Sequence, residues 1–248
     1  MKRFLAKSDP VMETTKRAKP RRLSLIIPAY NEAEVIEQAI READDALGRL
    51  ADEFEIIVVD DGSRDKTADI VERLRQQHRN VRLLRHPENR GYGAALRTGF
   101  QAARFDLVAF TDADCQFYLD DLSNLIALAD RFPIVAGYRV GRQDSRLRCF
   151  LSRGYNWLAR LLLGTRVCDV DCALKVFRRN TLQQILPQST GFFVNTEMFA
   201  RARKLGLPVV QHGVRHRPRL KGRSKVSLSD IPRTLLALIP FWWAQLLR

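Results

Sequence analysis

The stretch from Leu23 to Asp61, LSLIIPAYNEAEVIEQAIREADDALGRLADEFEIIVVDD, decides the fold of this chain. It begins and ends with a short apolar run rich in β-branched residues, the pattern of a strand buried on both faces. Between these runs, from Glu32 to Leu50, apolar residues recur at helical spacing. Asn31, with Glu34 three residues later, predicts a capping box at the start of the helix. Strand, helix and strand in this order predict a βαβ unit of a parallel sheet.

The same alternation continues along the chain. Further strands are expected at Val81–Leu84, Leu107–Thr111 and Ile134–Ala136, and further helices at Lys66–Gln77, Ala94–Arg104 and Leu119–Asp130. Past Gly137 the pattern loosens, with a helix near 152–163, a strand near 173–177 and a helix near 195–205. The sequence therefore predicts an α/β fold, an open and mostly parallel sheet with flanking helices.

Composition and charge limit the function classes. The chain has 248 residues, 46% of them hydrophobic, which is enough for one full core. Its formal net charge of +14 favours anionic partners, such as phosphorylated substrates, anionic lipid or nucleic acid. Four cysteines are too few for a disulfide scaffold and no apolar signal sequence opens the chain, so a reducing, cytosolic compartment is expected.

The two ends differ in composition from the middle. Residues 1–22 are expected to form a mobile basic arm, 23–226 the α/β domain, and 227–248 an amphipathic segment at a membrane interface. The thirteen residues from Leu235 to Leu247 are too few to cross a hydrocarbon core of about 30 Å. We therefore expect no transmembrane span, and peripheral attachment to the cytoplasmic face of a membrane.

Polar residues follow the expected strands where ligands bind in sheets of this kind, beyond the carboxyl ends. These stretches are Pro28-Ala29-Tyr30-Asn31-Glu32, Asp60-Asp61-Gly62-Ser63, Glu88-Asn89-Arg90-Gly91-Tyr92-Gly93 and Asp112-Ala113-Asp114. Tyr30 offers a ring for stacking, and Glu32 a polar contact to a base or ribose. Asp60 or Asp61 can accept hydrogen bonds from the same groups, and Ser63 is expected to cap the next helix.

A pair of acids supplies the candidate metal site. In an extended chain Asp112 and Asp114 point to the same side, and Gln116 joins them if the chain stays extended. Such oxygen ligands suit Mg²⁺ or Mn²⁺, and an ion there would neutralise charge on a departing nucleotide diphosphate. The alternative is a pair of solvated acids. Two glycines in the stretch 89–95 bring backbone amides close to an anion, or merely begin a helix.

Taken in order, these motifs resemble those of the family 2 inverting glycosyltransferases, most closely the dolichol-phosphate mannose synthase and polyprenyl-phosphate glycosyltransferase branch. The resemblance covers residues 23–227 and implies a GT-A fold, a nucleoside-diphosphate sugar donor and a divalent ion. GDP-mannose and UDP-glucose are the first donors to consider. By resemblance the metal is held by Asp112, Asp114 and Gln116. The nucleotide sugar is assigned to Pro28, Ala29, Tyr30, Glu32, Asp60, Asp61, Asp112, Ala113 and Lys225.

The branch also binds an acceptor phosphate through an Arg in a Gly-x-Arg turn and an Arg-x-x-x-Ser element. Here these are similar to Gly137-Tyr138-Arg139 and Arg148-Cys149-Phe150-Leu151-Ser152, and guanidinium groups suit bidentate binding of phosphate. The stretch 169–175 is similar to a family motif that has Gly-Phe where Ala173-Leu174 stand, which leaves the role of Lys175 open. The stretch 219–225 resembles the basic loop that closes over the donor phosphates.

The resemblance implies transfer of a sugar to a polyprenyl phosphate at an anionic membrane surface. A phosphate monoester has a second pKa of about 6, so it is already ionised near neutrality and needs no general base. We expect direct displacement with inversion, aided by Asp114, Arg139 and Arg148 as catalytic residues.

Three alternatives stay open at this point. A family 2 enzyme that glycosylates a hydroxyl of a glycan or glycolipid would need a base such as Glu197 or Asp171. A non-catalytic basic protein could bind nucleic acid or anionic membrane, although the aromatic residues do not interleave with the basic stretches, so no nucleic-acid partner is expected. A zinc site would use Cys168, Cys172, His212 and His216, but 39 residues separate the two pairs.

Overall fold

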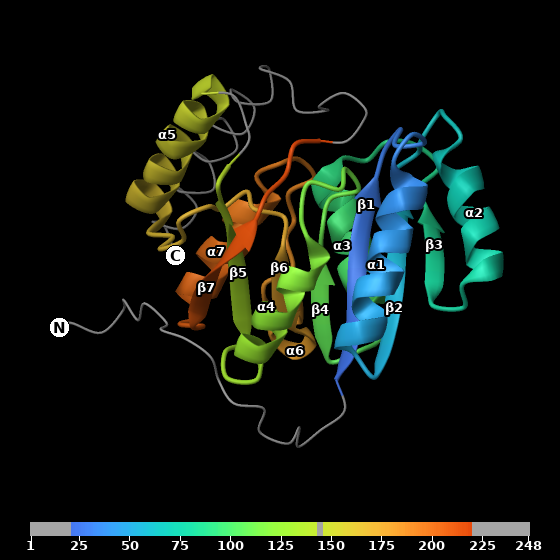
Figure 1. Cartoon of the computed structure of the whole chain (residues 1–248). Coiled ribbons are helices and arrows are strands. Elements are labelled where there is room, and N and C mark those ends of the chain that lie inside the picture. The colour runs from blue at the N-terminus through green and yellow to red at the C-terminus, as the bar shows by residue number, and fades with distance from the viewer. Residues whose placement is uncertain (1–20, 143–145, 220–248) are drawn as a thin grey trace.

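The computed structural model describes residues 21–142 and 146–219, with the side chains of residues 146–148 excepted. Within this part the chain forms a seven-stranded sheet in the order β3-β2-β1-β4-β6-β5-β7 (Figure 1). The strands are β1 (Arg22–Ala29), β2 (Glu53–Asp60), β3 (Val81–Arg85), β4 (Leu107–Phe110), β5 (Ile134–Val140), β6 (Lys175–Arg178) and β7 (Val209–Arg215). All neighbours are parallel except β6, which runs antiparallel to β4 and β5. The predicted α/β fold is confirmed, and the strand expected near 173–177 is present as β6, but its antiparallel direction was not predicted.

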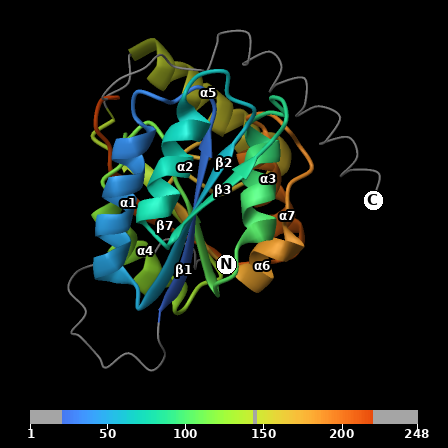
Figure 2. The ribbon, with the colours of Figure 1, turned by 90° about the vertical axis from the view of Figure 1, so that its right-hand side faces the viewer.

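Helices cover both faces of the sheet. They are α1 (Ile36–Leu50), α2 (Thr67–Gln77), α3 (Tyr92–Ala102), the 3-10 helix η1 (Leu119–Asp121), α4 (Leu122–Ala129), α5 (Arg146–Leu163), α6 (Arg179–Gln184) and α7 (Val194–Lys204). Helices α1 and α4 lie on one face, and α3, α6 and α7 on the other (Figure 2). Helix α5 lies beyond the end of the sheet formed by β5 and β7 (Figure 1). No described helix combines the length and apolar character needed to cross a bilayer.

The core holds β4 rigidly. Three aromatic rings pack together where α3, β4 and β6 meet: Phe100, Phe110 and Phe177, with ring centroids 5.7, 6.2 and 6.4 Å apart. All three side chains are fully buried, and truncating one such ring to alanine costs about 3–5 kcal/mol. Because Phe110 ends β4, this packing fixes the point from which Asp112 and Asp114 project.

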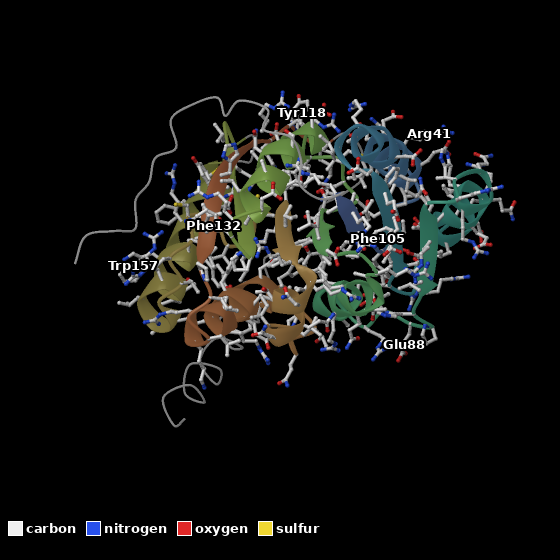
Figure 3. The ribbon with its side chains drawn as sticks, turned by 90° about the horizontal axis from the view of Figure 1, so that it is seen from below. Arg41, Glu88, Phe105, Tyr118, Phe132 and Trp157 are labelled. Carbon is white, nitrogen blue, oxygen red and sulfur yellow. The ribbon has the colours of Figure 1, made fainter. Side chains whose placement is uncertain are left out.

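The amino edge of the sheet is tied by a buried carboxylate. Glu55 accepts hydrogen bonds from the Ser24 hydroxyl at 2.7 Å and from the Arg104 backbone amide at 2.8 Å, and pairs with Arg82 at 2.5 Å. The backbone amide of Phe105, labelled in Figure 3, donates to the same Ser24 hydroxyl at 3.2 Å. A buried charge with this many partners is satisfied rather than reactive, so this edge has a structural role.

Two predicted caps are wrong. Helix α1 begins at Ile36 rather than at Glu32, and neither α1 nor α2 has a side-chain cap. Asn31 instead adopts a left-handed conformation (φ 51°), its amide donates to the Ser63 hydroxyl at 2.9 Å, and its side-chain oxygen accepts from the Arg64 amide at 2.8 Å. Both polar side chains therefore bond across to the neighbouring loop. These hydrogen bonds connect the loop after β1 to the loop after β2.

The ends of the described chain bear on the predicted boundaries. Arg22 lies in β1 rather than in the expected basic arm, and residues 1–20 lie outside the described residues. The expected membrane-interface segment at 227–248 lies outside them as well. Helix α6 was not predicted, because six residues are too few to show helical periodicity.

Candidate active site at the carboxyl edge of the sheet

The strand ends meet as predicted. Ala29 of β1 pairs with Asp60 of β2, and Ile26 of β1 pairs with Phe110 of β4. The amide of Thr111, the first residue after β4, donates to the Ile26 carbonyl at 3.0 Å. The loops after β1, β2 and β4 consequently leave the sheet side by side, and their polar residues form one site.

The two acids after β4 interact electrostatically; Asp114 is buried and Asp112 is half-buried. The Tyr92 hydroxyl donates a 2.9 Å hydrogen bond to Asp112 Oδ1, and Asp114 is 5% exposed. Desolvation, followed by the charge of Asp114, raises the pKa of Asp112 to about 7. The same burial, together with the charge of Asp112, holds the pKa of Tyr92 well above its ordinary value, so that this hydroxyl stays a donor.

The chain does not stay extended after Asp112. Ala113 and Asp114 form a turn, and Cys115 adopts a left-handed conformation with φ 56°. The Gln116 amide NH₂ donates to the carbonyl of Arg217 at 3.4 Å. The extended backbone that would place Gln116 beside the two acids is therefore wrong, and Gln116 as a metal ligand stays a prediction.

The guanidinium of Arg219 lies between two carboxylates at this edge of the sheet, those of Asp114 and Glu32. Arg219 Nη2 lies 2.8 Å from Asp114 Oδ2, and Arg219 Nη1 lies 3.9 Å from Glu32 Oε1. The guanidinium side chain is only 20% exposed. The carboxylates thus converge as a cation site requires, and their oxygen atoms suit Mg²⁺ or Mn²⁺. In the described part of the chain no three His, Cys, Asp or Glu side chains cluster to hold a metal, so an ion here would take further ligands from a diphosphate or water.

Asp60 and Asp61, which the sequence left as alternatives, differ sharply. The carboxylate of Asp61 accepts from the Arg90 and Gly91 amides at 2.9 and 2.8 Å and contacts the His86 ring nitrogen Nδ1 at 2.6 Å. Asp60 is fully buried, and its Oδ2 has no hydrogen-bond partner among the described residues, with Arg85 Nε 3.4 Å away. A buried oxygen that accepts no hydrogen bond at this edge can accept one from a ligand, so Asp60 is the better candidate for nucleotide contact.

The glycine-containing stretch 89–95 does not form a free anion site. Its Arg90 and Gly91 amides already bind the Asp61 carboxylate, and the Gly93 amide donates to the Thr190 carbonyl at 2.6 Å. A Cβ atom at Gly93 would lie 2.3 Å from the Ser189 carbonyl oxygen. The glycines therefore permit close packing of the 189–190 backbone, and the anion-binding interpretation is wrong.

The remaining donor-side residues line the loop after β1. Pro28 and Ala29 end β1 beside Val59 and Asp60, Tyr30 is half-buried, and Glu32 is 8% exposed. Ala113, between the two acids, is buried. Lys225 lies outside the described residues.

On the acceptor side Arg139 is held by a carboxylate. Its Nε and Nη2 donate to the two oxygens of Asp169, each at 2.7 Å, and both side chains are about nine-tenths buried. Burial opposes the charge of Arg139, but the hydrogen bonds that Arg139 donates to Asp169 outweigh it and raise the pKa of Arg139. Asp169 thus holds the guanidinium that is predicted to bind a phosphate in one fixed orientation.

Ser152 lies beside an arginine that the sequence did not single out. Arg142 Nη1 donates to the Ser152 hydroxyl at 2.9 Å, and the Asn156 side-chain amide reaches it at 3.4 Å. Arg148 is in the first turn of α5, and its side chain lies outside the described part of the structure. The structure therefore places Arg142 with Ser152.

Lys175 is a buried amine beneath the site. Its Nζ donates to the Cys172 carbonyl and, at 3.0 Å, to the side-chain oxygen of Asn195, and lies 4.9 Å from the Phe110 ring centroid. Burial lowers the pKa of Lys175, while the nearby charges of Asp171, Asp169 and Asp112 act to raise it. Lys175 thus links the donor acids electrostatically to the acceptor side.

The two alternative bases differ in availability. The Glu197 carboxylate accepts from the amides of Gln188 and Ser189 at 2.9 and 2.8 Å and pairs with Arg201 at 2.7 Å. Burial acts to raise the pKa of Glu197, but these hydrogen bonds outweigh it and the pKa is lowered. Burial and the charge of Asp169 raise the pKa of Asp171. Of the two carboxylates, only Asp171 therefore has the raised pKa expected of a general base.

The proposed zinc ligands do not converge. Cys172 is buried, and burial raises the pKa of its thiol to about 12, whereas Cys168 is exposed. His216 packs its ring against Phe117, with centroids 5.5 Å apart. Zinc binds thiolates, which a thiol of this kind does not readily form, and nothing in the described residues supports this alternative.

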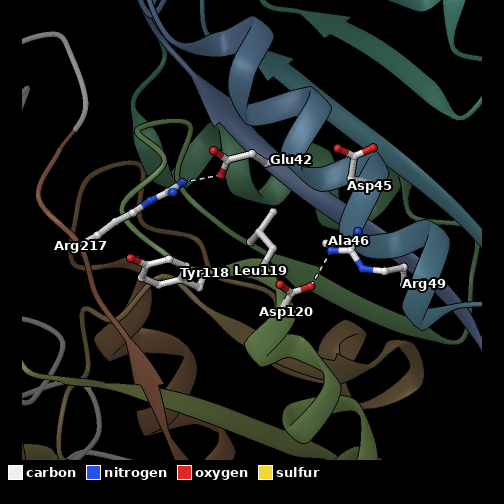
Figure 4. A pocket seen from close by; sticks show the side chains of 8 residues that line it. All are labelled: Glu42, Asp45, Ala46, Arg49, Tyr118, Leu119, Asp120 and Arg217. Carbon is white, nitrogen blue, oxygen red and sulfur yellow. Dashed lines mark hydrogen bonds and ion pairs between the residues drawn. The ribbon is translucent and has the colours of Figure 1, made fainter.

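A cavity of about 230 Å³ lies outside this edge, between α1 and η1. Figure 4 shows Arg217 reaching across it to Glu42, and the Arg217 Nε also donates to the Cys115 carbonyl at 2.5 Å. Asp45, Arg49 and Asp120 line its far side (Figure 4). The cavity thus lies on the outer side of the turn that follows Asp114.

Comparisons with known proteins agree with this geometry. The family model for Glycosyl transferase family 2 matches residues 24–186. Glycosyltransferase AglD of Haloferax volcanii is 32% identical over 246 residues, covering 91% of this chain and 38% of AglD. The chain therefore spans less than half of AglD. Undecaprenyl-phosphate 4-deoxy-4-formamido-L-arabinose transferase of Pseudomonas fluorescens is 31% identical over 244 residues, covering 90% of this chain and 70% of the relative.

Solved structures share the fold. Glucosyl-3-phosphoglycerate synthase from Mycobacterium tuberculosis, in complex with Mn²⁺, UDP and glucosyl-3-phosphoglycerate, superposes with a TM-score of 0.67 at 24% identity, over 88% of this chain and 80% of that one. The same enzyme with Mn²⁺ and UDP-glucose gives 0.68 at 22% identity, over 90% and 79%. From the family match and the shared GT-A architecture we conclude that this chain belongs to glycosyl transferase family 2 and is a glycosyltransferase.

Proposed function

We propose that this enzyme transfers a sugar from a nucleoside-diphosphate sugar to a polyprenyl phosphate, with inversion, using Mg²⁺ or Mn²⁺. The observation that carries the proposal is the cation position between Asp114 and Glu32, filled here by the Arg219 guanidinium. The Pseudomonas fluorescens relative is named as a transferase to undecaprenyl phosphate, which supports this class of acceptor.

The donor side is assigned from the contacts of each residue. Asp112 and Asp114 would hold the ion, which would neutralise charge on the diphosphate as the nucleotide departs. Asp60 offers a ribose or base a buried oxygen that accepts no hydrogen bond from the described residues, and Tyr30 offers a half-buried ring for stacking. Asp61 is assigned a structural role, because its carboxylate is already satisfied by the loop 86–91.

The acceptor side is a cluster of guanidinium groups around the start of α5. Arg139, Arg142 and Ser152 would bind the acceptor phosphate, together with Arg148 by resemblance. The charges of Arg139, Lys175 and Arg142 act to lower the pKa of Asp171. The charge of Asp112 acts to raise the pKa of Lys175. The donor and acceptor groups thus belong to one electrostatic site, as a direct transfer requires.

Helix α5 supplies a surface for a membrane. Phe150, Trp157 and Leu161 are 72%, 63% and 63% exposed, and at about 100° per residue they lie within roughly 40° of one another around the helix. Arg153 and Arg160 are exposed on one flank, and α5 contains no acidic residue. An apolar stripe with Trp and a basic flank fits the interface of an anionic membrane, for which we propose the cytoplasmic face.

The reaction needs no proton transfer. An ionised oxygen of the acceptor phosphate attacks the anomeric carbon, and the bond from that carbon to the diphosphate oxygen breaks, its electron pair leaving on the nucleotide. The guanidinium groups orient the acceptor, and Lys175 offsets the negative charge of Asp112, Asp169 and Asp171.

The main rival is transfer to a hydroxyl of a glycan or glycolipid, for which Asp171 is the remaining base. One experiment separates the two. The purified enzyme is given Mn²⁺ or Mg²⁺, a panel of UDP-, GDP- and dTDP-sugars beginning with UDP-glucose and GDP-mannose, and either a short polyprenyl phosphate or the matching polyprenol. An acid-labile product formed only from the phosphate supports the proposal. Transfer to the alcohol, or to neither lipid, contradicts it.

A further inference from the structure

Arg219 contacts Asp114, one of the two acids proposed to hold the metal ion. Its guanidinium donates at 2.8 Å to Asp114 Oδ2, a carboxylate that is itself 5% exposed. The second terminal nitrogen, Nη1, is buried without a hydrogen-bond partner in the described part of the chain, and its distance of 3.9 Å to Glu32 is long. Arg219 therefore makes one strong contact with Asp114 and one weak contact with Glu32, and it can leave this position only if another cation replaces it.

The segment that carries Arg219 is anchored independently of it. Residues 216–217 run antiparallel to residues 116–117, through the bridge between Phe117 and His216 and a 2.9 Å hydrogen bond from the Arg217 amide to the Gln116 carbonyl. The Arg217 side chain pairs with Glu42 (Figure 4) and donates a hydrogen bond to the Cys115 carbonyl. None of these contacts involves Arg219. Its side chain can therefore leave Asp114 while residues 216–217 stay in place.

We propose that Arg219 is a resident counter-cation that is exchanged for the metal ion when the donor binds. In the metal-free site its positive charge offsets the repulsion between Asp112 and Asp114, and so keeps the acids converged. A divalent ion on Asp114 would repel the guanidinium, which would then bind the oxygens of the donor diphosphate. This inference rests on the metal and donor parts of the proposed function, and not on the identity of the acceptor.

The exchange has a consequence of opposite sign for two ligands. Arg219 competes with the metal alone, so its removal strengthens metal binding. It assists the metal-bound nucleotide, so its removal weakens nucleotide binding. A residue that served only to stabilise the fold, or a general change in charge, would not produce this reversal.

The experiment is a calorimetric titration of the full chain at pH 8 with Mn²⁺ alone, and then with UDP or GDP at saturating Mn²⁺. Arg219→Gln is expected to bind Mn²⁺ alone about tenfold more tightly than the wild type, equivalent to about 1.4 kcal/mol, and the nucleotide about tenfold more weakly. Arg219→Lys keeps the charge without the planar fork and should fall between the two.

Arg215→Gln is the matched control. Arg215 lies on the same segment but pairs with Asp121, at 2.7 Å, and its loss removes one positive charge without touching the acid pair. It should change both affinities less than about twofold, within the range of a surface pair. Unchanged Mn²⁺ affinity in Arg219→Gln, or equal effects in both variants, overturns the exchange. If Mn²⁺ affects nucleotide binding in no variant, the metal part of the proposed function fails as well.

Discussion

The hydroxyl of Tyr92, at the start of α3, donates a 2.9 Å hydrogen bond to Asp112, which follows β4. The Tyr92 ring also stacks on Phe192, with centroids 5.3 Å apart. Helix α3 thereby orients one of the two acids that we propose hold the metal ion. The sequence places these residues twenty positions apart and contains no pattern that joins them.

Removing this hydrogen bond should weaken metal binding while sparing the fold. Tyr92→Phe keeps the ring stacked on Phe192 but leaves the Asp112 carboxylate less well held. We expect about a tenfold loss of Mn²⁺ affinity, as is common for partners that orient a metal ligand. Calorimetry with Mn²⁺ measures it, and the melting temperature should change by no more than a few degrees. An unchanged affinity would mean that Tyr92 does not orient Asp112.

Metal binding should depend on pH through Asp112. Desolvation and Asp114 raise the pKa of Asp112 to about 7, and a metal ion needs the ionised form. Mn²⁺ affinity should therefore be constant above about pH 8 and fall by up to about tenfold for each pH unit below 7. For the metal-free protein the sign is reversed, because a carboxyl with a raised pKa stabilises the fold as pH falls through that pKa. Titrations at pH 6, 7 and 8 test the first statement, and a flat profile would contradict it.

The two candidate bases should behave differently. If the acceptor is a phosphate, Asp171→Asn should keep polyprenyl phosphate transfer within about fivefold of the wild type, since no proton has to be removed. A loss of more than about a hundredfold would instead identify Asp171 as the base of a hydroxyl acceptor.

Glu197→Gln should act on stability. Its carboxylate accepts two backbone amides and pairs with Arg201, so its neutralisation should cost about 1–3 kcal/mol of unfolding free energy. Urea denaturation measures this cost. A variant that unfolds like the wild type but has lost transfer would show that Glu197 takes part in the chemistry.

The acceptor cluster can be tested through Arg142. Arg142→Gln removes the guanidinium beside Ser152 and should raise the KM for polyprenyl phosphate about tenfold, the usual cost of a charge-assisted hydrogen bond. The KM for the sugar nucleotide should stay the same, because Arg142 lies on the acceptor side. Steady-state kinetics with each substrate varied in turn separate the two effects. A rise in the donor KM alone would show that Arg142 acts on the sugar nucleotide and not on the acceptor.

The membrane surface of α5 can be tested with vesicles of anionic lipid. Trp157→Ser and Phe150→Ser each remove a large exposed apolar side chain and should each weaken vesicle binding about tenfold or more. Leu205→Ser is the control, since Leu205 is also exposed (51%) but follows α7, outside the stripe. Sedimentation with vesicles compares the three. Equal losses in all of them would refute a specific role for α5.

The sequence by itself determined the order of strands and helices from β1 to β5 and the edge at which the polar residues gather. Both follow from local periodicity: buried strands are apolar runs, amphipathic helices repeat every 3.6 residues, and parallel strands end at a common edge. Asp112 and Asp114 could be located in this way because they directly follow a strand.

Only the tertiary structure decided which polar residues are satisfied and which remain for a ligand. Asp60 and Asp61 are adjacent in the sequence, yet the loop 86–91 satisfies the Asp61 carboxylate, while one oxygen of Asp60 accepts no hydrogen bond from any described residue. Arg219 contacts Asp114 across 105 positions of the chain, and Asn31 bonds to a neighbouring loop instead of capping its helix. Such pairings depend on which segments the sheet brings together, and periodicity along one segment contains no information about them.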